Sequence, residues 1–139
     1  MRSADGLQEA NESFYQALET LDLDAMDRIW LHEDWVRCIH PGWETIVGWP
    51  LVRRSWEQIF ANTGWMRVAN TDVETRDLGE LGLVTCAENI SIRSQGEIGL
   101  AVAMATNLFK RTPDGWRLVL HQASPSPVQV SAPAGGGLM

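Results

Sequence analysis

From residue 65 onward, apolar residues alternate with polar ones at a period of two, which is typical of β-strands and not of helices. Four long strands are predicted, over residues 66–76, 83–93, 96–110 and 116–123, and only short connections separate them. The last connection, Thr112 to Gly115, has Pro and Gly where a type I turn favours them. Because short connections make neighbouring strands antiparallel, the second half of the chain predicts a twisted four-strand meander.

The region before the meander begins with two predicted helices. Apolar residues recur at steps of three and four over residues 5–20, which predicts an amphipathic helix with Ser3 or Asp5 as its cap. Asp22 is placed to cap a second, shorter helix. The inner face of this second helix is predicted to carry Leu23, Met26 and Trp30.

A short hairpin and a third helix are predicted between these helices and the meander. Residues 36–40 and 45–49 indicate two short strands, and Pro50 stands at the first position of the helix that follows. We expect Gly64 to end this helix in the left-handed conformation. The predicted class is therefore α+β, with three N-terminal helices packed on one face of a strongly curved, mainly antiparallel sheet.

His40 ends the first short strand, immediately before Pro41 fixes the turn. Alternation places His40 on the same face as Val36 and Cys38, so a titratable imidazole ends an otherwise apolar face. A polar group in an apolar cleft can orient a ligand. The alternative is that His40 packs in the core and bonds a neighbouring carbonyl.

Three further polar residues occupy strand faces that could look inward. Glu88 shares its side with apolar residues, so burial there would raise its pKa or require a donor. Asn107 follows a row of alanines, Ala101, Ala103 and Ala105, which would leave room above the sheet. His121 is expected to share a side with Arg117 and Val119, opposite Trp116, Leu118 and Leu120.

If these groups converge, His40 would be a general base while Asn107 or Glu88 stabilises developing charge; the three are the candidate catalytic residues. The alternative is a purely structural role, in which Glu88 pairs with an arginine and His121 lies at a sheet edge or a subunit contact. Among seven tryptophans, most are expected in the core, with Trp43 and Trp49 nearer a pocket rim or subunit contact. The candidate ligand-binding residues are Tyr15, Trp30, Trp43, Trp56 and His121.

Length and composition limit the remaining possibilities. A chain of 139 residues is expected to form one domain, over residues 1–124, followed by a flexible Pro- and Gly-rich tail over 125–139. A net charge of −7 without a basic tract disfavours nucleic acid, and no apolar run is long enough for a membrane span. Cys38 and Cys86 are expected to be reduced and buried, and without a secretory signal the cytoplasm is the expected location.

Several segments together resemble the SnoaL-like and ketosteroid-isomerase-like branch of the nuclear transport factor 2-like (NTF2-like) superfamily. The segments are residues 38–42, 55–60, 105–109 and 114–125, and the resemblance covers about residues 5–125. It implies a cone-shaped fold, an apolar pocket whose mouth lies between helices and sheet, and a dimer formed through the outer sheet face. Many functions share this fold, so the activity must be argued from the site.

Ketosteroid isomerases of this fold use an Asp base with Tyr and protonated Asp donors. At the positions that correspond by this resemblance, His40 replaces the Asp base and Asn107 replaces the protonated Asp on the strand. Phe14 replaces the tyrosine, and Tyr15 is the next residue. All three residue types differ, which argues against steroid isomerisation.

Three functions remain open from the sequence. The first is a homodimeric protein that binds a small, largely apolar organic molecule. The second is an acid–base isomerase, lyase or hydrolase acting beside a carbonyl, with His40 as base. The third is a non-catalytic association module. No cofactor is expected, because the sequence has neither a glycine-rich phosphate loop nor a metal-ligand spacing.

Overall fold

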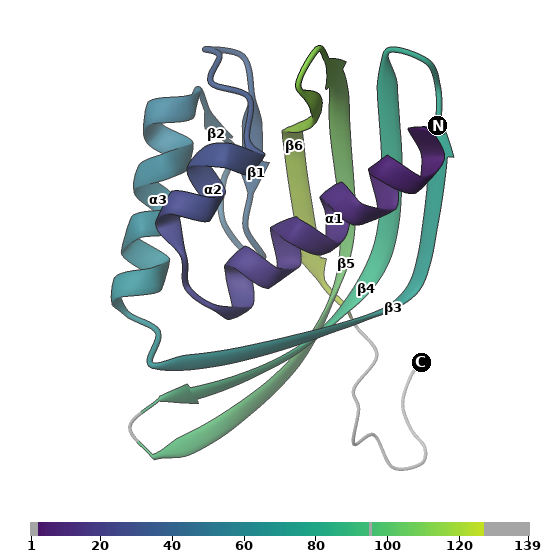
Figure 1. Cartoon of the computed structure of the whole chain (residues 1–139). Helices are drawn as coiled ribbons and strands as arrows, with labels where there is room; N and C mark the ends of the chain where they lie inside the picture. Colours follow the sequence, from purple (N-terminus) through teal and green to yellow (C-terminus); the bar gives the residue numbers. More distant parts are fainter. Residues whose placement is uncertain (1–2, 95, 127–139) are drawn as a thin grey trace.

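The computed structural model describes residues 3–94 and 96–126. The first half contains three helices and a short hairpin, and the second half contains four long strands (Figure 1). In chain order the elements are α1 (Ser3–Glu19), α2 (Leu23–Ile29), β1 (Arg37–Ile39), β2 (Ile46–Val47), α3 (Trp49–Ala61), β3 (Trp65–Asp77), β4 (Leu81–Ser94), β5 (Glu97–Thr112) and β6 (Gly115–Pro125).

The six strands form one sheet in the order β2-β1-β6-β5-β4-β3. The meander β3 to β6 is antiparallel throughout, and the hairpin joins it through a parallel pairing of β1 with β6. All three helices lie on one face of the curved sheet, with α1 running obliquely across the meander (Figure 1). The predicted α+β architecture is confirmed, including its mainly antiparallel sheet.

The helix ends agree with the sequence at α2 and differ at α3. Asp22 accepts a hydrogen bond from the Ala25 N–H and caps α2 as predicted, although this helix ends at Ile29 and leaves Trp30 just beyond it. The expectation that Gly64 ends α3 in the left-handed conformation is wrong: α3 ends at Ala61, and Gly64 is not among the glycines with positive φ. The Asn62 amide and Thr63 hydroxyl bond the last carbonyls instead, so no left-handed residue is needed.

A β-bulge in β6 changes which of its residues face the helices. Leu108 of β5 pairs with Leu120, but the next residue, Phe109, pairs with Leu118, so Val119 is an extra residue. Leu118 is therefore fully buried on the same face as His121. The expectation that these two residues face opposite sides is wrong, because strict alternation does not continue through a bulge.

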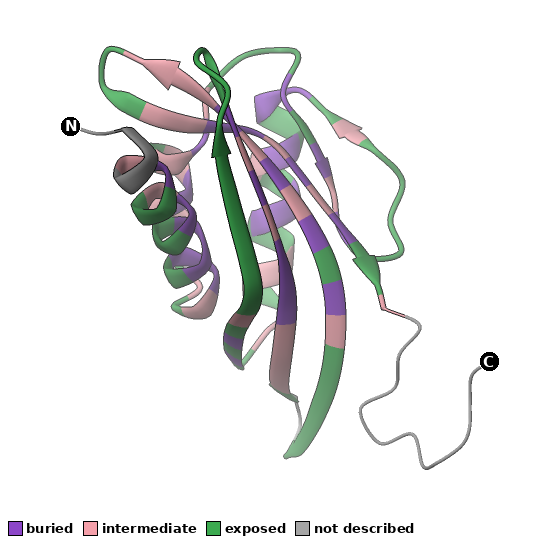
Figure 2. Ribbon diagram, turned by 90° about the vertical axis from the view of Figure 1, so that its right-hand side faces the viewer, coloured by how far each residue is buried: buried purple, intermediate pink, exposed green. Residues whose placement is uncertain are grey.

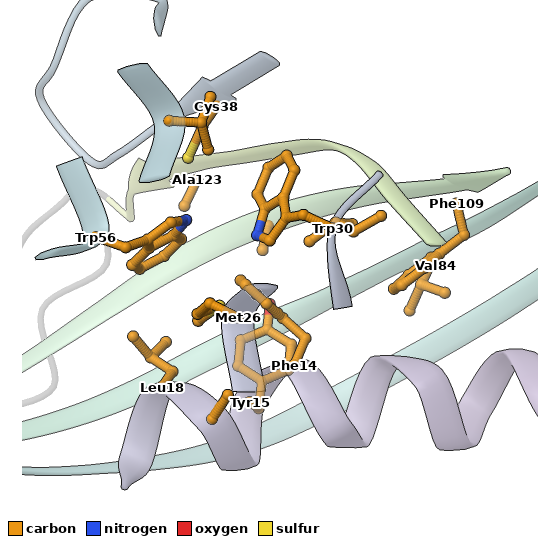
Figure 3. Packing of buried hydrophobic residues seen from close by; sticks show 14 of the residues in the cluster. Phe14, Tyr15, Leu18, Met26, Trp30, Cys38, Trp56, Val84, Phe109 and Ala123 are labelled. Atoms are coloured by element: carbon orange, nitrogen blue, oxygen red, sulfur yellow. The ribbon is translucent and has the colours of Figure 1, made fainter. Parts of the chain in front are cut away.

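The core lies between the helices and the concave face of the sheet (Figure 3). It is rich in aromatic side chains, and its largest fully buried members include Phe14, Trp30, Trp56 and Phe109. Cys38 and Cys86 are buried free thiols, as predicted. The first residues of β5, 97–101, are exposed, and residues 90–92 of β4, which pair with residues 99–101, are of intermediate burial (Figure 2).

The last strand runs further than the sequence indicates. β6 continues to Pro125, and the Ser126 N–H donates to the Val102 carbonyl at 2.8 Å. Residues 125 and 126, which the sequence assigns to the tail, thus still pair with β5, and residues 127–139 of the predicted tail lie outside the described residues.

Candidate functional site

Four of the predicted polar residues form one buried cluster beneath α1. Tyr15 from α1, Glu88 from β4, Asn107 from β5 and His121 from β6 are each 5% exposed or less. The Tyr15 hydroxyl donates to Glu88 Oε2 at 2.6 Å, and Asn107 Nδ2 donates to the Tyr15 oxygen at 3.1 Å. His121 Nδ1 lies 2.6 Å from Asn107 Oδ1. Neighbouring strands and the helix that crosses them thus bring together residues far apart in sequence.

The hydrogen bonds of this Glu88 cluster all run in one direction. Asn107 uses Nδ2 to donate to Tyr15 and to Asn11 Oδ1, so its Oδ1 faces His121 and can only accept. His121 Nδ1 therefore carries a proton and donates it. Because Tyr15 then donates to Glu88, the chain of donors that starts at His121 ends on the carboxyl group of Glu88.

Burial controls the charge of this cluster. It raises the pKa of Glu88 to about 7, although the hydrogen bond from Tyr15 opposes the rise. Burial, followed by the nearby His40, lowers the pKa of His121 to about 3. His121 is therefore neutral at neutral pH, and its 4.0 Å approach to Glu88 Oε2 is not an ion pair there. Burial also raises the pKa of Tyr15, which stays protonated.

His40 is buried in a neighbouring part of the core, with a different partner. Its Nε2 lies 2.9 Å from Ser55 Oγ, and the Ser55 hydroxyl donates to the Val52 carbonyl at 2.7 Å. Because the one hydroxyl proton goes to Val52, Nε2 of His40 must carry its own proton and donate it. Ser55 and His40 are therefore not arranged as a nucleophile and its base. Burial lowers the pKa of His40 to about 4.

Aromatic rings fill the space around the two imidazoles. The Trp56 ring centroid lies 4.6 Å from that of His40 and 6.0 Å from that of His121. Phe14 also packs against His121, with 4.9 Å between centroids. The row of small residues is shorter than expected, since Ala101 is exposed while Ala103 and Ala105 are buried. Polar groups thus converge around Glu88, while ring contacts link them to His40.

The core leaves two hydrogen-bond donors unsatisfied. Within the described residues, the indole N–H groups of Trp30 and Trp56 are buried and have no acceptor. In Figure 3 the nitrogen edge of Trp56 is turned toward Ala123. Buried donors without a protein acceptor are rare, and in folded proteins an ordered water or a ligand commonly accepts from such groups. Trp43, by contrast, is 45% exposed and contacts the edge of His40 from outside.

Residues that the sequence did not single out complete the surroundings of the cluster. Asn11 is buried one turn before Tyr15, and its position within the apolar stripe of α1 was an available signal. Asn70 pairs across the sheet with Glu88, and its buried Oδ1 has no partner within the described residues. Asn11, Tyr15 and Asn70 line a cavity of about 350 Å³ between α1 and β3. Five of the best-formed cavities in the described part of the chain are lined by residues other than His40, Glu88, Asn107 and His121.

Residues 3–94 and 96–126 contain neither a cluster of metal-binding side chains nor a membrane-spanning helix. In these ranges, no group of three or more His, Cys, Asp or Glu side chains could hold a metal ion. None of the helices in the same ranges is long and apolar enough to cross a membrane.

Comparison with solved structures gives close matches over most of the chain. A "putative dehydratase from the NTF2-like family" of Streptomyces avermitilis has 38% identity and a TM-score of 0.84, covering 88% of this chain and 95% of that one. A "putative calcium/calmodulin-dependent protein kinase type II association domain" of Thiobacillus denitrificans has 32% identity and a TM-score of 0.77, covering 86% and 94%. An NTF2-like protein of Salmonella enterica, at 14% identity and a TM-score of 0.81, shows the fold only.

A curated relative and a family model complete the comparison. F-box protein SKIP8 of Arabidopsis thaliana is 28% identical over 114 residues, which span 82% of this chain and 47% of that protein. The chain thus covers about half the length of this relative. The model of the SnoaL-like domain matches residues 7–129. The chain therefore belongs to the SnoaL-like domain family, within the NTF2-like superfamily.

Proposed function

We propose that this SnoaL-like domain binds a small, largely apolar organic molecule that presents one hydrogen-bond acceptor, such as a ketone, to the interior of the fold. The unsatisfied indole N–H groups of Trp30 and Trp56 are the observation that supports this most directly. Each such donor costs about 1–3 kcal/mol when buried without an acceptor. An acceptor carried by an apolar ligand would remove the cost of each donor that it reaches.

Cyclohexanone and methylcyclohexane provide a matched pair of probes, because the rings are similar in size and only the ketone has an acceptor. Titrated into the ¹⁵N-labelled full chain, cyclohexanone is expected to shift the indole N–H resonances of Trp30 and Trp56, and methylcyclohexane is not. Trp30→Phe and Trp56→Phe keep an aromatic ring but remove the donor, so each should weaken ketone binding. Trp65→Phe, at an exposed site on β3, is the control. A tightly held water that cyclohexanone does not displace would contradict the proposal.

Acid–base chemistry beside the bound ketone is a second candidate, favoured by the Glu88 cluster. Glu88 has a pKa near 7, and Tyr15 bonds to it at 2.6 Å, so the carboxylate and the acid are both populated at neutral pH. The carboxylate would take a proton from the carbon next to the carbonyl, leaving an enolate, and then return a proton to that carbon. This assigns the role of base to Glu88, where the sequence favours His40.

Hydrogen exchange at the ketone distinguishes these two bases. In D₂O, the wild-type chain is expected to catalyse the incorporation of deuterium next to the carbonyl of cyclohexanone, followed by NMR of the ketone. Glu88→Gln should abolish this exchange, and His40→Gln should retain it. If His40→Gln lost the exchange while Glu88→Gln retained it, His40 would be the base instead of Glu88. Exchange no faster than in buffer would remove the catalytic candidate and leave binding untouched.

Self-association through the outer face of the sheet is proposed as a separate property. Ile98, Leu100 and Met104 point outward from β5 and are 57%, 69% and 49% exposed. A row of exposed apolar side chains on a sheet face is typical of an interface, and a second copy offers the same row to it. We expect the wild-type chain to sediment as a dimer and Leu100→Lys to sediment as a monomer. A monomeric wild-type chain would contradict it.

A further inference from the structure

A groove between α1 and α2 is the largest of the five cavities considered above, with a volume of about 570 Å³. Its lining includes Phe109 of β5 and Trp116 and Arg117 of β6, close to the last hairpin. Its apolar lining includes Ala17, Ile29, Phe109 and Trp116. This volume is within the range of small-molecule sites. Phe109 is fully buried, whereas Trp116 is partly exposed and has the Arg111 guanidinium 4.3 Å from its ring centroid.

Two arginines also line this α1–α2 groove. The Arg117 guanidinium on β6 donates to the backbone carbonyl of Arg28 on α2, so two cationic residues 89 positions apart are held together. The carbonyl is neutral and leaves the charge of Arg117 uncompensated. In the described part of the chain, the ion pairs do not include Arg28 or Arg117.

The nearest carboxylate in the lining has another role. Asp22 lines the groove, but its Oδ1 accepts the Ala25 N–H as the cap of α2. Two unpaired guanidinium groups beside one engaged carboxylate favour an anion, even though the chain as a whole has a net charge of −7. Guanidinium groups match the planar geometry of a carboxylate, with two parallel hydrogen bonds.

We propose that the α1–α2 groove binds a small molecule with a carboxylate at one end and an apolar, preferably aromatic, body. The carboxylate lies against Arg28 and Arg117, and the body packs on Ile29 and Trp116. None of the residues that line this groove belongs to the Glu88 cluster or provides the indole donors of Trp30 and Trp56. The groove is therefore a second site, and it does not depend on the function proposed for the core.

Three probes with one skeleton test the charge requirement: 4-phenylbutyrate, 4-phenylbutanol and 4-phenylbutylamine. Titrated calorimetrically into the full chain, the carboxylate is expected to bind at least about tenfold more tightly than the alcohol, and the amine more weakly than either. In ¹⁵N spectra the carboxylate should shift resonances of α1 and α2 and leave the indole N–H of Trp56 unchanged. That last readout separates this groove from the core site.

Arg28→Gln is the most informative variant, because it removes a charge but keeps the backbone carbonyl that Arg117 bonds. It is expected to weaken the binding of 4-phenylbutyrate about tenfold, and Arg117→Gln should weaken it by a similar factor. Arg54→Gln, on the exposed side of α3, removes the same charge elsewhere and should have no effect. Equal binding of the amine and the carboxylate, unchanged binding in Arg28→Gln, or no binding of 4-phenylbutyrate would each overturn the proposal.

Discussion

The two buried histidines, His40 and His121, have similar surroundings but different hydrogen-bond partners. Both contact the Trp56 ring, and burial lowers the pKa of both well below the ordinary value. His121 donates into a chain that ends on Glu88, whereas His40 donates to Ser55, whose proton goes to a backbone carbonyl. Burial therefore decides that both rings are neutral, and the partner decides whether a ring is connected to a group that titrates near pH 7.

The largest expected effect comes from removing the ring that both histidines contact. Trp56→Ala is predicted to lower the free energy of unfolding by about 4 kcal/mol, because truncating a fully packed tryptophan leaves a cavity. Denaturant unfolding measures this loss. The same cavity should admit indole, which would restore part of the stability. Trp65→Ala, at an exposed tryptophan on β3, should cost much less. A small loss of unfolding free energy in Trp56→Ala would show that contacts other than the Trp56 ring hold His40 and His121 in place.

Glu88 gives the cluster a pH dependence opposite in sign to that of the His40 side. Its pKa is about 7 in the folded chain and 4.5 in a model peptide, so the unfolded chain releases this proton at lower pH. Stability from the protonated carboxyl is complete below pH 4.5 and is lost as the pH rises through 7.

Glu88→Gln isolates this contribution, because the lowered pKa values of His40 and His121 act in the opposite direction in both chains. We predict that the unfolding free energy of wild type relative to Glu88→Gln falls by about 3 kcal/mol between pH 4.5 and pH 8. Parallel urea titrations across this range measure the difference. A constant difference would mean that Glu88 titrates in the folded chain as it does in a peptide.

The smallest expected effect tests the His40 side. Ser55→Ala removes the acceptor of the His40 Nε2–H in a buried position, which is predicted to cost about 1–2 kcal/mol. The loss should be the same at pH 6 and pH 8, because neither group titrates in that range. Ser55→Thr retains the hydroxyl and serves as the control. If the cost of Ser55→Ala changed with pH between these values, His40 would be coupled to Glu88 after all.

Local periodicity was sufficient for the strands of the meander and for the faces of β4 and β5. Glu88 and Asn107 are buried where alternation predicted, because the pairing of β4 with β5 has no bulge. The prediction of the side that Leu118 faces was wrong. A bulge depends on how two strands pair, so the residue pattern of one strand does not reveal it. The prediction that Gly64 caps α3 was wrong because the side chains of Asn62 and Thr63 already bond the last helix carbonyls.

The connections within the site were harder to predict than its members. The bond between Asn107 and Tyr15 joins residues 92 positions apart, and it exists because α1 crosses the sheet at that point. The sequence named both residues but could not show that they meet. Nor could it show that Ser55 is the partner of His40, since that depends on how α3 is rotated against β1.

The bulge at Val119 makes this part of β6 one residue longer than the part of β5 with which it pairs. His121 lies on one side of it and Leu118 on the other, and the extra residue lets both face the helices across an odd number of positions. A chain that lost Val119 would still bury both, because Leu118 and His121 would then stand two positions apart in a regular strand and would keep Phe109 and Asn107 as their partners. Loss of this one residue is therefore expected to be tolerated, and an alignment of distant members of the family should allow a one-residue gap between Leu118 and His121.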